Sequence, residues 1–408
     1  MSGQPGKNII VAYKVESVFG TAVSGGGAEA FRIAPGQGLT LRRAMIEDPE
    51  VRKDGQQSMV RLGSKSVDGS YVGPFSVDSF DTFLEALFRA VWSAATAVTS
   101  DGGATWTSFT VASATTITRV GTGDFTATFR VGDIIRLTNY STASDNDVNL
   151  RVTAVVAGTL TFIAPSGVTI TAGAADAACT ITRLRKLQNA ATLTRRSYTI
   201  EEYFQDLDES ERFTGCRCVS LRLTMAPDGT VMAEFGFMGQ DMTIVGTASA
   251  PNFTSPTEYT TIALVAVDAA IRFNGAEQAV LTSLDLTFDL GAQGQAVIGS
   301  LLTPNVYEGA MMVSGQFSAV RTALTASNLA TFLAETDNVE LHILLEEPDA
   351  TVPKDTIALF LPRLKLTGTD APYGNDGALI ETVPFVARAR VAATGYDAIT
   401  AAFSTSAA

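Results

Sequence analysis

The chain has 408 residues, with 29 lysines and arginines against 42 aspartates and glutamates, which gives a formal net charge of −13. Its 46% of hydrophobic and 17% of charged residues exclude a disordered chain and allow two or three domains with sizeable cores. An acidic chain without a cluster of lysines and arginines is a poor candidate for gripping nucleic acid, and a single histidine argues against multi-histidine metal sites and catalysis.

Most of the chain consists of short alternating runs broken by Gly, Asp, Asn and Pro, a pattern that predicts strands and turns. One segment instead has helical spacing, with apolar residues at Phe80, Phe83, Leu84, Leu87, Phe88 and Val91. We expect Asp78 or Ser79 to cap this helix and its apolar side to pack on a sheet. Its polar residues are expected on the opposite side: Asp81, Glu85 and Arg89.

The connection 45–66, before the helix, has mixed charge and little periodicity. A structureless connection of about twenty residues inside a compact domain is uncommon and usually binds something. Its charged residues, together with apolar neighbours, suit docking on another subunit: Glu47, Asp48, Glu50, Arg52, Lys53 and Asp54. The alternative is a mobile surface loop.

Residues 97–187 have a different composition, rich in Thr, Ala, Gly and Val, with Pro165 as the one proline. The run Phe129-x-Val-Gly-Asp-x-Ile, followed by a loop and a long strand, is common in small β-barrels, where Gly-Asp makes a tight corner. We interpret this segment as an inserted β-barrel or β-sandwich domain whose two ends lie close together, as insertion into a loop requires.

The remainder contains a weak internal repeat. Segment 38–42 resembles 283–287, segment 67–71 resembles 313–317, segment 82–84 resembles 331–333, and segment 220–224 resembles 363–367. Ser327 and Asn328 are cap candidates for a second helix. Each match is weak, but the four occur in one order, which favours a duplication over two unrelated β-rich domains. The first copy would then carry roughly 100 extra residues.

Together these patterns predict a mainly β protein with two tandem β-sandwich domains, each flanked by one helix, and an inserted small β-domain. The first sandwich would comprise residues 1–96 and 188–248, the insert residues 97–187, and the second sandwich residues 249–408. The acidic excess follows this division. The net charge is 0 for residues 1–96, +1 for the insert, −4 for residues 188–248 and −10 for the rest.

No catalytic signature is present: there is no glycine-rich nucleotide loop, no HExxH and no GxSxG. The doublets Glu201-Glu202 and Glu346-Glu347 lie in strand-like runs, where adjacent residues face opposite ways, so neither makes a facing acid pair. His342 lies between Leu341 and Ile343 and is expected to be packed. We therefore predict a protein that is not an enzyme and needs no cofactor or metal.

The three cysteines, Cys179, Cys216 and Cys218, are too few and odd in number for a disulfide framework, which is typical of a reducing cytoplasm. The Cys216-x-Cys218 pair lacks a second ligand pair, so buried thiols are expected rather than a metal site. No signal peptide or long apolar stretch occurs, so we expect no membrane anchor.

Three segments resemble the major tail tube proteins of long-tailed, non-contractile bacteriophages. They are the opening Val-Ala-Tyr-Lys-Val-Glu-Ser-Val-Phe-Gly-Thr-Ala at 11–22, the run Leu-Thr-Leu-Arg-Arg-Ala-Met-Ile-Glu-Asp-Pro-Glu at 39–50, and Gly-Ser-Tyr-Val-Gly-Pro-Phe at 69–75. The resemblance is strongest over residues 8–96, fair over 190–245 and weaker beyond 250, and it does not extend to the insert.

The resemblance implies a β-sandwich with one flanking helix, in six-fold rings whose inner strands close into a barrel and which stack through a long loop. A duplicated chain would build such a ring from three subunits. It further implies a virion protein assembled in the host cytoplasm, with an acidic lumen through which DNA and the tape-measure protein pass without specific binding, and contacts to other tail proteins. The alternative is a virion decoration or receptor-binding β-protein whose insert contacts carbohydrate; a β-sandwich glycan hydrolase ranks last.

Overall fold

The computed structural model describes residues 6, 8–36, 38–56, 59–165, 167–190, 192–277, 280–322, 339–347, 353–371, 377–389 and 399–406. Within these ranges the chain is mainly antiparallel β, with one α-helix and three short 3-10 turns. The predicted β-rich fold class is confirmed. The second predicted helix, around 327–333, lies outside the described residues.

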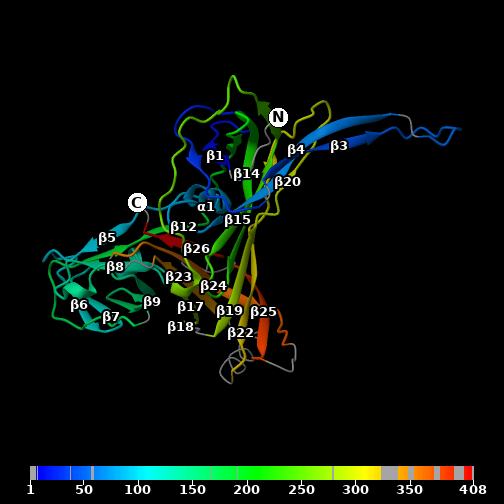
Figure 1. Cartoon of the computed structure of the whole chain (residues 1–408). Coiled ribbons are helices and arrows are strands. Elements are labelled where there is room, and N and C mark those ends of the chain that lie inside the picture. Colours follow the sequence, from blue (N-terminus) through cyan, green and yellow to red (C-terminus); the bar gives the residue numbers. More distant parts are fainter. Residues whose placement is uncertain are drawn as a thin grey trace.

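One wide antiparallel sheet runs through the molecule (Figure 1). Each strand pairs with the next in the order β3, β4, β15, β14, β19, β22, β25 and β24. Their bounds are Leu39–Glu47, Val60–Pro74, Met232–Gly239, Glu209–Met225, Leu281–Asp289, Met312–Val320, Ile380–Ala387 and Thr356–Leu366. The first four strands lie within residues 39–239 and the last four within residues 281–387, and we call the parts of the chain that contain them its first and second half.

Two smaller sheets back the wide one, because β14 and β24 each continue into a second layer. The first half of β14 lies between β13 and β16, and β13 also pairs with β1, which pairs with β2. The first half of β24 lies between β23 and β26, with β17 and β18 beyond β23 and β12 beyond β26. The bounds are β1 Ile9–Val15, β2 Glu29–Ala30, β12 Arg185–Gln188, β13 Tyr198–Phe204, β16 Asp241–Val245, β17 Ala269–Phe273, β18 Ala276–Glu277, β23 Val339–Glu346 and β26 Ala402–Thr405.

The strand pairings show that the two halves are structural repeats. Strands β1, β13, β14 and β16 of the first half correspond in order to β17, β23, β24 and β26 of the second. Gly69 and Gly315 occupy equivalent positions: an added Cβ would lie 2.5 Å from the Gly38 carbonyl oxygen in one half and 2.5 Å from that of Asp285 in the other. Glycine is required there because the neighbouring strand passes so close.

The register of the repeat agrees with the sequence match of 67–71 with 313–317 and differs from two of the other matches. Gly69 pairs with Leu39 and Gly315 pairs with Leu286, so Leu39 corresponds to Leu286 rather than to Leu284. In the same way β14 and β24 superimpose with Cys218 on Leu366, because these residues pair with Phe237 and Phe385, which face the two glycines. The first of these two matches is shifted by two residues, and a Leu-x-Leu pattern with its period of two fits such a shift equally well. The second, 220–224 with 363–367, is shifted by five residues.

The helix α1, Asp81–Phe88, packs its apolar side into a core shared by both halves. The Phe83 ring centroid lies 4.2 Å from that of Tyr13 and 5.5 Å from that of Phe235. The predicted caps were wrong: the N-cap is Phe80 without a side-chain hydrogen bond, and Ser79 bonds instead to Ser76. Arg89 was expected to be exposed but is buried, because it ends the helix in a left-handed conformation and donates to the Gly309 carbonyl at 2.9 Å.

Residues 96–183 form a separate seven-stranded antiparallel sheet with its own core, left of the wide sheet in Figure 1. The order is β5 (Thr96–Thr99), β11 (Thr180–Arg183), β8 (Ile134–Thr138), β9 (Leu150–Val156), β10 (Thr159–Ile163), β7 (Thr116–Val120) and β6 (Ser108–Ser113). The chain enters and leaves this insert side by side, since the Ser93 amide donates to the Lys186 carbonyl at 2.9 Å. The described sheets are compatible with the expected domain bounds, which remain a prediction.

Candidate functional site

The connection 45–66 is a projecting hairpin rather than a structureless loop. β3 extends to Glu47 and β4 begins at Val60, so the two strands run out of the body together as an arm (Figure 1). The sequence pattern concealed this because both faces of the arm are exposed, so no alternation of apolar and polar residues marks the strands. We call residues 43–62 the arm and 48–59 its tip.

The six charged residues singled out from the sequence lie at or near the tip, and all are exposed. The Arg52 guanidinium is paired with Asp54 at 2.8 Å, and the Asp48 and Asp54 carboxylates accept the amides of Glu50 and Gln56. These contacts shape the tip from within. The arm also exposes large apolar side chains: Met45, Ile46, Val51, Met59, Val60 and Leu62. Val51 is 97% exposed, so the apolar surface of the arm is not covered by other parts of the described chain.

The equivalent connection of the second half does not project in this way. This connection, 290–311, contains the short pair β20 (Gln293–Gly294) and β21 (Val306–Tyr307) and folds back on the base of the arm. The Lys65 amide donates to the Leu301 carbonyl at 2.8 Å, and the Thr303 hydroxyl donates to the Lys65 carbonyl at 3.3 Å. Glu308 of this connection pairs with Arg217 at 3.2 Å. The second connection thus stabilises the first half of its own chain.

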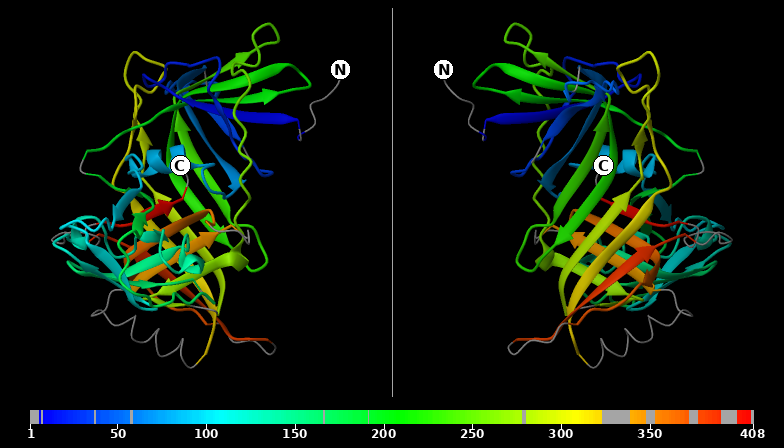
Figure 2. Two further views of the ribbon diagram at one scale, coloured as in Figure 1. Left: turned by 90° about the vertical axis from the view of Figure 1, so that its left-hand side faces the viewer. Right: turned by 90° about the vertical axis from the view of Figure 1, so that its right-hand side faces the viewer.

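One face of the wide sheet is not covered by other elements, as the right-hand view of Figure 2 shows. Along β14, β15 and β19 buried residues alternate with residues that are less buried and lie on this face. Many of the uncovered side chains are small and hydroxyl-bearing: Thr40, Ser66, Ser70, Ser220, Thr224, Thr287, Ser314, Ser318 and Thr382. The uncovered face is therefore largely polar, and many of its side chains are short.

The uncovered face carries few charges. Its described acids are Asp68, Glu234, Asp285 and Asp289, and its described bases are Arg42, Arg222 and Lys365. Two ion pairs balance part of this charge, because Arg42 lies 3.0 Å from Asp68 and the Arg222 Nε lies 3.0 Å from Asp285. Glu234 accepts a hydrogen bond from Ser70 at 2.8 Å. The described residues of this face therefore have a slightly negative net charge.

The insert packs on the second half of the chain through buried polar groups. Arg151 of β9 is 1% exposed and forms an ion pair with Glu340 of β23, and Asn149 donates to Glu346 at 2.6 Å. His342 lies beside Arg151 and Arg272 and is fully buried. Burial, together with these two positive charges, holds the pKa of His342 well below its usual 6.5, so the imidazole is neutral. The expected packed histidine is confirmed.

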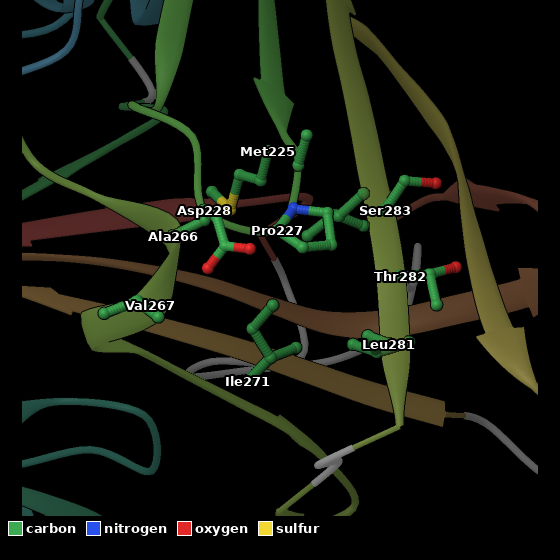
Figure 3. Close-up of a pocket in the computed structure, with 11 residues that line it drawn as sticks. Met225, Pro227, Asp228, Ala266, Val267, Ile271, Leu281, Thr282 and Ser283 are labelled. Atoms are coloured by element: carbon green, nitrogen blue, oxygen red, sulfur yellow. The ribbon is translucent and has the colours of Figure 1, made fainter.

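Two cavities contain ionisable groups. Figure 3 shows one of about 210 Å³, lined by Met225, Pro227, Ile271 and Leu281, in which Asp228 is the one ionisable group among the described lining residues. A second, of about 630 Å³, lies between the layers of the first half and contains Tyr71 and Glu202. Tyr71 donates to Glu202, and burial raises the pKa of both groups. Neither cavity combines a nucleophile with a base.

The cysteines are free and buried, as expected. Burial raises the pKa of the Cys179 thiol to about 12 and that of Cys216 well above its usual range, so these thiols stay protonated. In the part of the chain that the structure describes, no cluster of three or more His, Cys, Asp or Glu side chains could hold a metal ion. In that same part, no helix has the length and apolar character needed to span a membrane.

A projecting arm, an uncovered polar sheet face and unpaired strand edges suit a protein that assembles, and comparison with known families agrees. The family model described as Phage tail tube protein matches residues 6–387. The chain belongs to the phage tail tube protein family. It is therefore a structural component of a virion tail, in a family not known for enzymatic activity. No curated protein matches the chain.

This phage tail tube protein has two candidate functional surfaces that the sequence analysis missed. The uncovered hydroxyl face is one, and its signal is present in the runs Ser66-x-Asp68-x-Ser70 and Ser314-x-Gln316-x-Ser318. The edge residues of β3 are another. Strand edges carry no sequence signal of their own, because they are set by which strands happen to be neighbours.

Proposed function

We propose that this protein polymerises into stacked rings that form the tube of a long, non-contractile phage tail, with three chains in each ring. The observation that carries the proposal is the wide sheet, in which two repeats lie side by side and one face stays uncovered. Open strand edges promote aggregation, and a closed ring prevents this because each chain covers the edges of its neighbours. Two repeats per chain make a ring of three chains pseudo-six-fold. The alternative of a decoration or receptor-binding protein has no observation in its favour.

The uncovered face would line the lumen, through which DNA and the tape-measure protein pass. A weakly acidic wall of hydroxyl groups repels phosphates slightly and offers no cluster of lysines or arginines to hold them. Such a wall favours passage over binding.

The arm would join one ring to the next, with the charged tip residues 47–54 as the stacking contact and the exposed apolar side chains as the area buried. The two tube domains would be residues 1–96 with 188–248 and residues 249–408. The insert, 97–187, would decorate the outside of the tube, and assembly with other tail proteins would take place in the host cytoplasm before the tail joins the virion.

Electron microscopy of the purified chain tests the proposal. Hollow tubes, or rings with three-fold symmetry, are the expected result. A chain that stays monomeric at high concentration, both alone and with its tail partners, would contradict it.

A further inference from the structure

The wide sheet contains an internal joint between the two repeats. Strand β14 pairs with β19 in antiparallel register, with Leu221 opposite Phe288 and Leu223 opposite Leu286. Among the described residues, the sheet has an open edge at each of its two ends. At one end β3 pairs only with β4. At the other end, the part of the chain after Leu364 in β24 no longer pairs with β23 and pairs only on the side of β25. Because the halves are repeats, the internal joint defines the geometry that these two open edges would adopt with each other.

The repeat equivalence fixes the register of such a second joint. In β14 and β24, Arg222 pairs with Glu234 and Asp370 pairs with Thr382 at equivalent places, after the same one-residue shift in each strand. Leu221 therefore corresponds to Thr369 and Leu223 to Ala371. In the partner strands, Leu286 corresponds to Leu39 and Phe288 to Leu41. Transfer of the internal joint places Thr369 opposite Leu41 and Ala371 opposite Leu39.

The backbone of the β24 edge points the right way for this pairing. Asp370 exchanges hydrogen bonds of 2.9 and 2.8 Å with Thr382 on the β25 side. Since successive residues of a strand direct their amide and carbonyl groups to alternate sides, those of Thr369 and Ala371 point to the open side. Within the described ranges, neither residue makes a backbone hydrogen bond.

The β3 edge is arranged in the same way. The Lys65 amide points away from β3, toward Leu301, so Ser66 and Asp68 direct their backbone groups at Arg42 and Thr40. Leu39 and Leu41 therefore point outward. The Leu39 amide is held by the Glu202 carboxylate at 3.1 Å, a side chain standing in for a strand partner.

The side chains also match. Asp370 and Thr369 are exposed on one edge, and Arg42 is exposed on the other. In the transferred register Asp370 lies opposite Thr40 and diagonal to Arg42, so an opposite-charge pair spans the joint. The apolar positions are smaller than inside the chain, with Thr369 and Ala371 in place of Leu221 and Leu223.

We propose that residues 368–371 of one chain pair with β3 of a second copy in this antiparallel register, and that this pairing closes the ring. The inference rests on the proposed tube function and adds the two edges and their register to it. Each of the two edges thus pairs with the other edge of an identical chain.

Cysteine cross-linking tests the register. Thr40→Cys and Asp370→Cys in one chain place two thiols directly opposite each other across the joint, and the three native cysteines are buried and do not compete. Mild oxidation of assembled protein is expected to give covalent dimers and trimers on a non-reducing gel, with no larger species. The matched control, Leu41→Cys with Asp370→Cys, places the thiols on opposite faces of the sheet and should cross-link at least tenfold less.

A second variant tests the backbone contact. Thr369→Pro removes an outward amide and should abolish ring formation while the monomer stays folded, whereas Thr369→Val keeps the amide and should leave rings intact. If rings form but the Thr40 and Asp370 variant does not cross-link, or the control cross-links equally, the register is wrong and the tube function stands. If the unmodified chain forms no rings with its tail partners, both proposals fail together.

Discussion

The two repeats of this phage tail tube protein differ most in the connection between their first two strands. In the first repeat β3 and β4 continue into an arm that leaves the body, with Val51 at its tip almost fully exposed. In the second repeat the equivalent connection folds back and bonds to Lys65. The connection of one copy thus projects away from the body, and that of the other stabilises its own chain. Duplication allowed this division, because a ring of three chains would need only three arms.

The repeats also differ in what covers them. The helix α1 and the aromatic cluster around Phe83 back the first repeat, whereas the insert packs against β23 and β24 of the second. The insert is connected in sequence to the first repeat and packed in space on the second. Consequently it ties the two repeats together independently of the joint between β14 and β19.

The largest expected effect comes from making the first repeat resemble the second. Replacement of residues 48–59 by an Asn-Gly turn removes the stacking tip, so we expect single rings in place of tubes by electron microscopy. The thermal unfolding temperature should stay unchanged, because the described tip residues are exposed. Val297→Ser with Ile298→Ser in the second connection is the matched control and should leave tubes intact. Tubes of normal length without the tip would refute the division of roles.

The next effect concerns the insert. Arg151→Met removes the buried partner of Glu340 and leaves a carboxylate beside apolar residues, which should lower the free energy of unfolding by about 3 kcal/mol. Arg119→Met, also in the insert, removes a side chain that bonds only to carbonyls of the insert itself and should cost about 0.5 kcal/mol. Urea titration measures both. Equal losses would mean that the docking of the insert does not depend on Arg151.

Acid should affect the second repeat through His342. The folded chain keeps this imidazole neutral because its pKa is lowered, whereas the unfolded chain takes up a proton below pH 6.5. Stability is therefore lost as the pH falls, by about 1.4 kcal/mol for each pH unit below 6.5. Urea titrations at pH 7.5, 6.5 and 5.5 should show this slope in the native chain relative to His342→Gln. Parallel curves for the two proteins would count against it.

The first repeat should respond in the opposite direction. Burial raises the pKa of Asp81 from 3.8 to about 7, even though Arg185 lies 3.4 Å away and opposes the shift. The folded chain holds a proton there that the unfolded chain has released, so the contribution of this group is lost as the pH rises from 4 toward 7. Asp81→Asn serves as the counterpart of the His342 variant and should flatten the dependence of stability on pH between pH 4 and 7.

The smallest effect is expected at the joint between the repeats. The pair formed by Arg222 and Asp285 lies on the uncovered face, with the arginine side chain 52% exposed. Exposed ion pairs contribute little, so Arg222→Ala should lower the free energy of unfolding by only about 0.5 kcal/mol. Apolar contacts such as that of Leu223 with Leu286 hold the joint instead. A loss similar to that of Arg151→Met would show that charge, not packing, connects the repeats.

The sequence allowed the β-rich class, the strands of the insert, the helix around Phe83 and the buried cysteines to be predicted, since each depends on local periodicity or composition. The register of the repeat was predicted for 67–71 and 313–317 but not for 38–42, because a Leu-x-Leu strand fits its neighbour equally well two residues further on. The predicted cap Ser79 does not cap the helix, because its hydroxyl bonds to that of Ser76 and to that of Thr261, which is far along the chain.

The arm illustrates the limit most clearly. The charged residues 47–54 are exposed, and the strands that carry them have no apolar face. The extension of β3 to Glu47 and the start of β4 at Val60 therefore had no signal in the sequence. Their role in stacking remains a proposal. The uncovered face and the open edges depend on the arrangement of eight strands, which no single segment encodes.

The adjacency of Ser93 and Lys186 gives the protein a natural graft point. Because the chain leaves the tube body and returns to it at neighbouring backbone positions, another domain whose ends meet could replace the insert without stretching β12 away from β26. Such an exchange would uncover Glu340, His342 and the apolar side of β24. A display scaffold made from this protein would therefore need substitutions on the second repeat, far along the sequence from the site of the graft, so that these newly exposed groups tolerate solvent or the new domain.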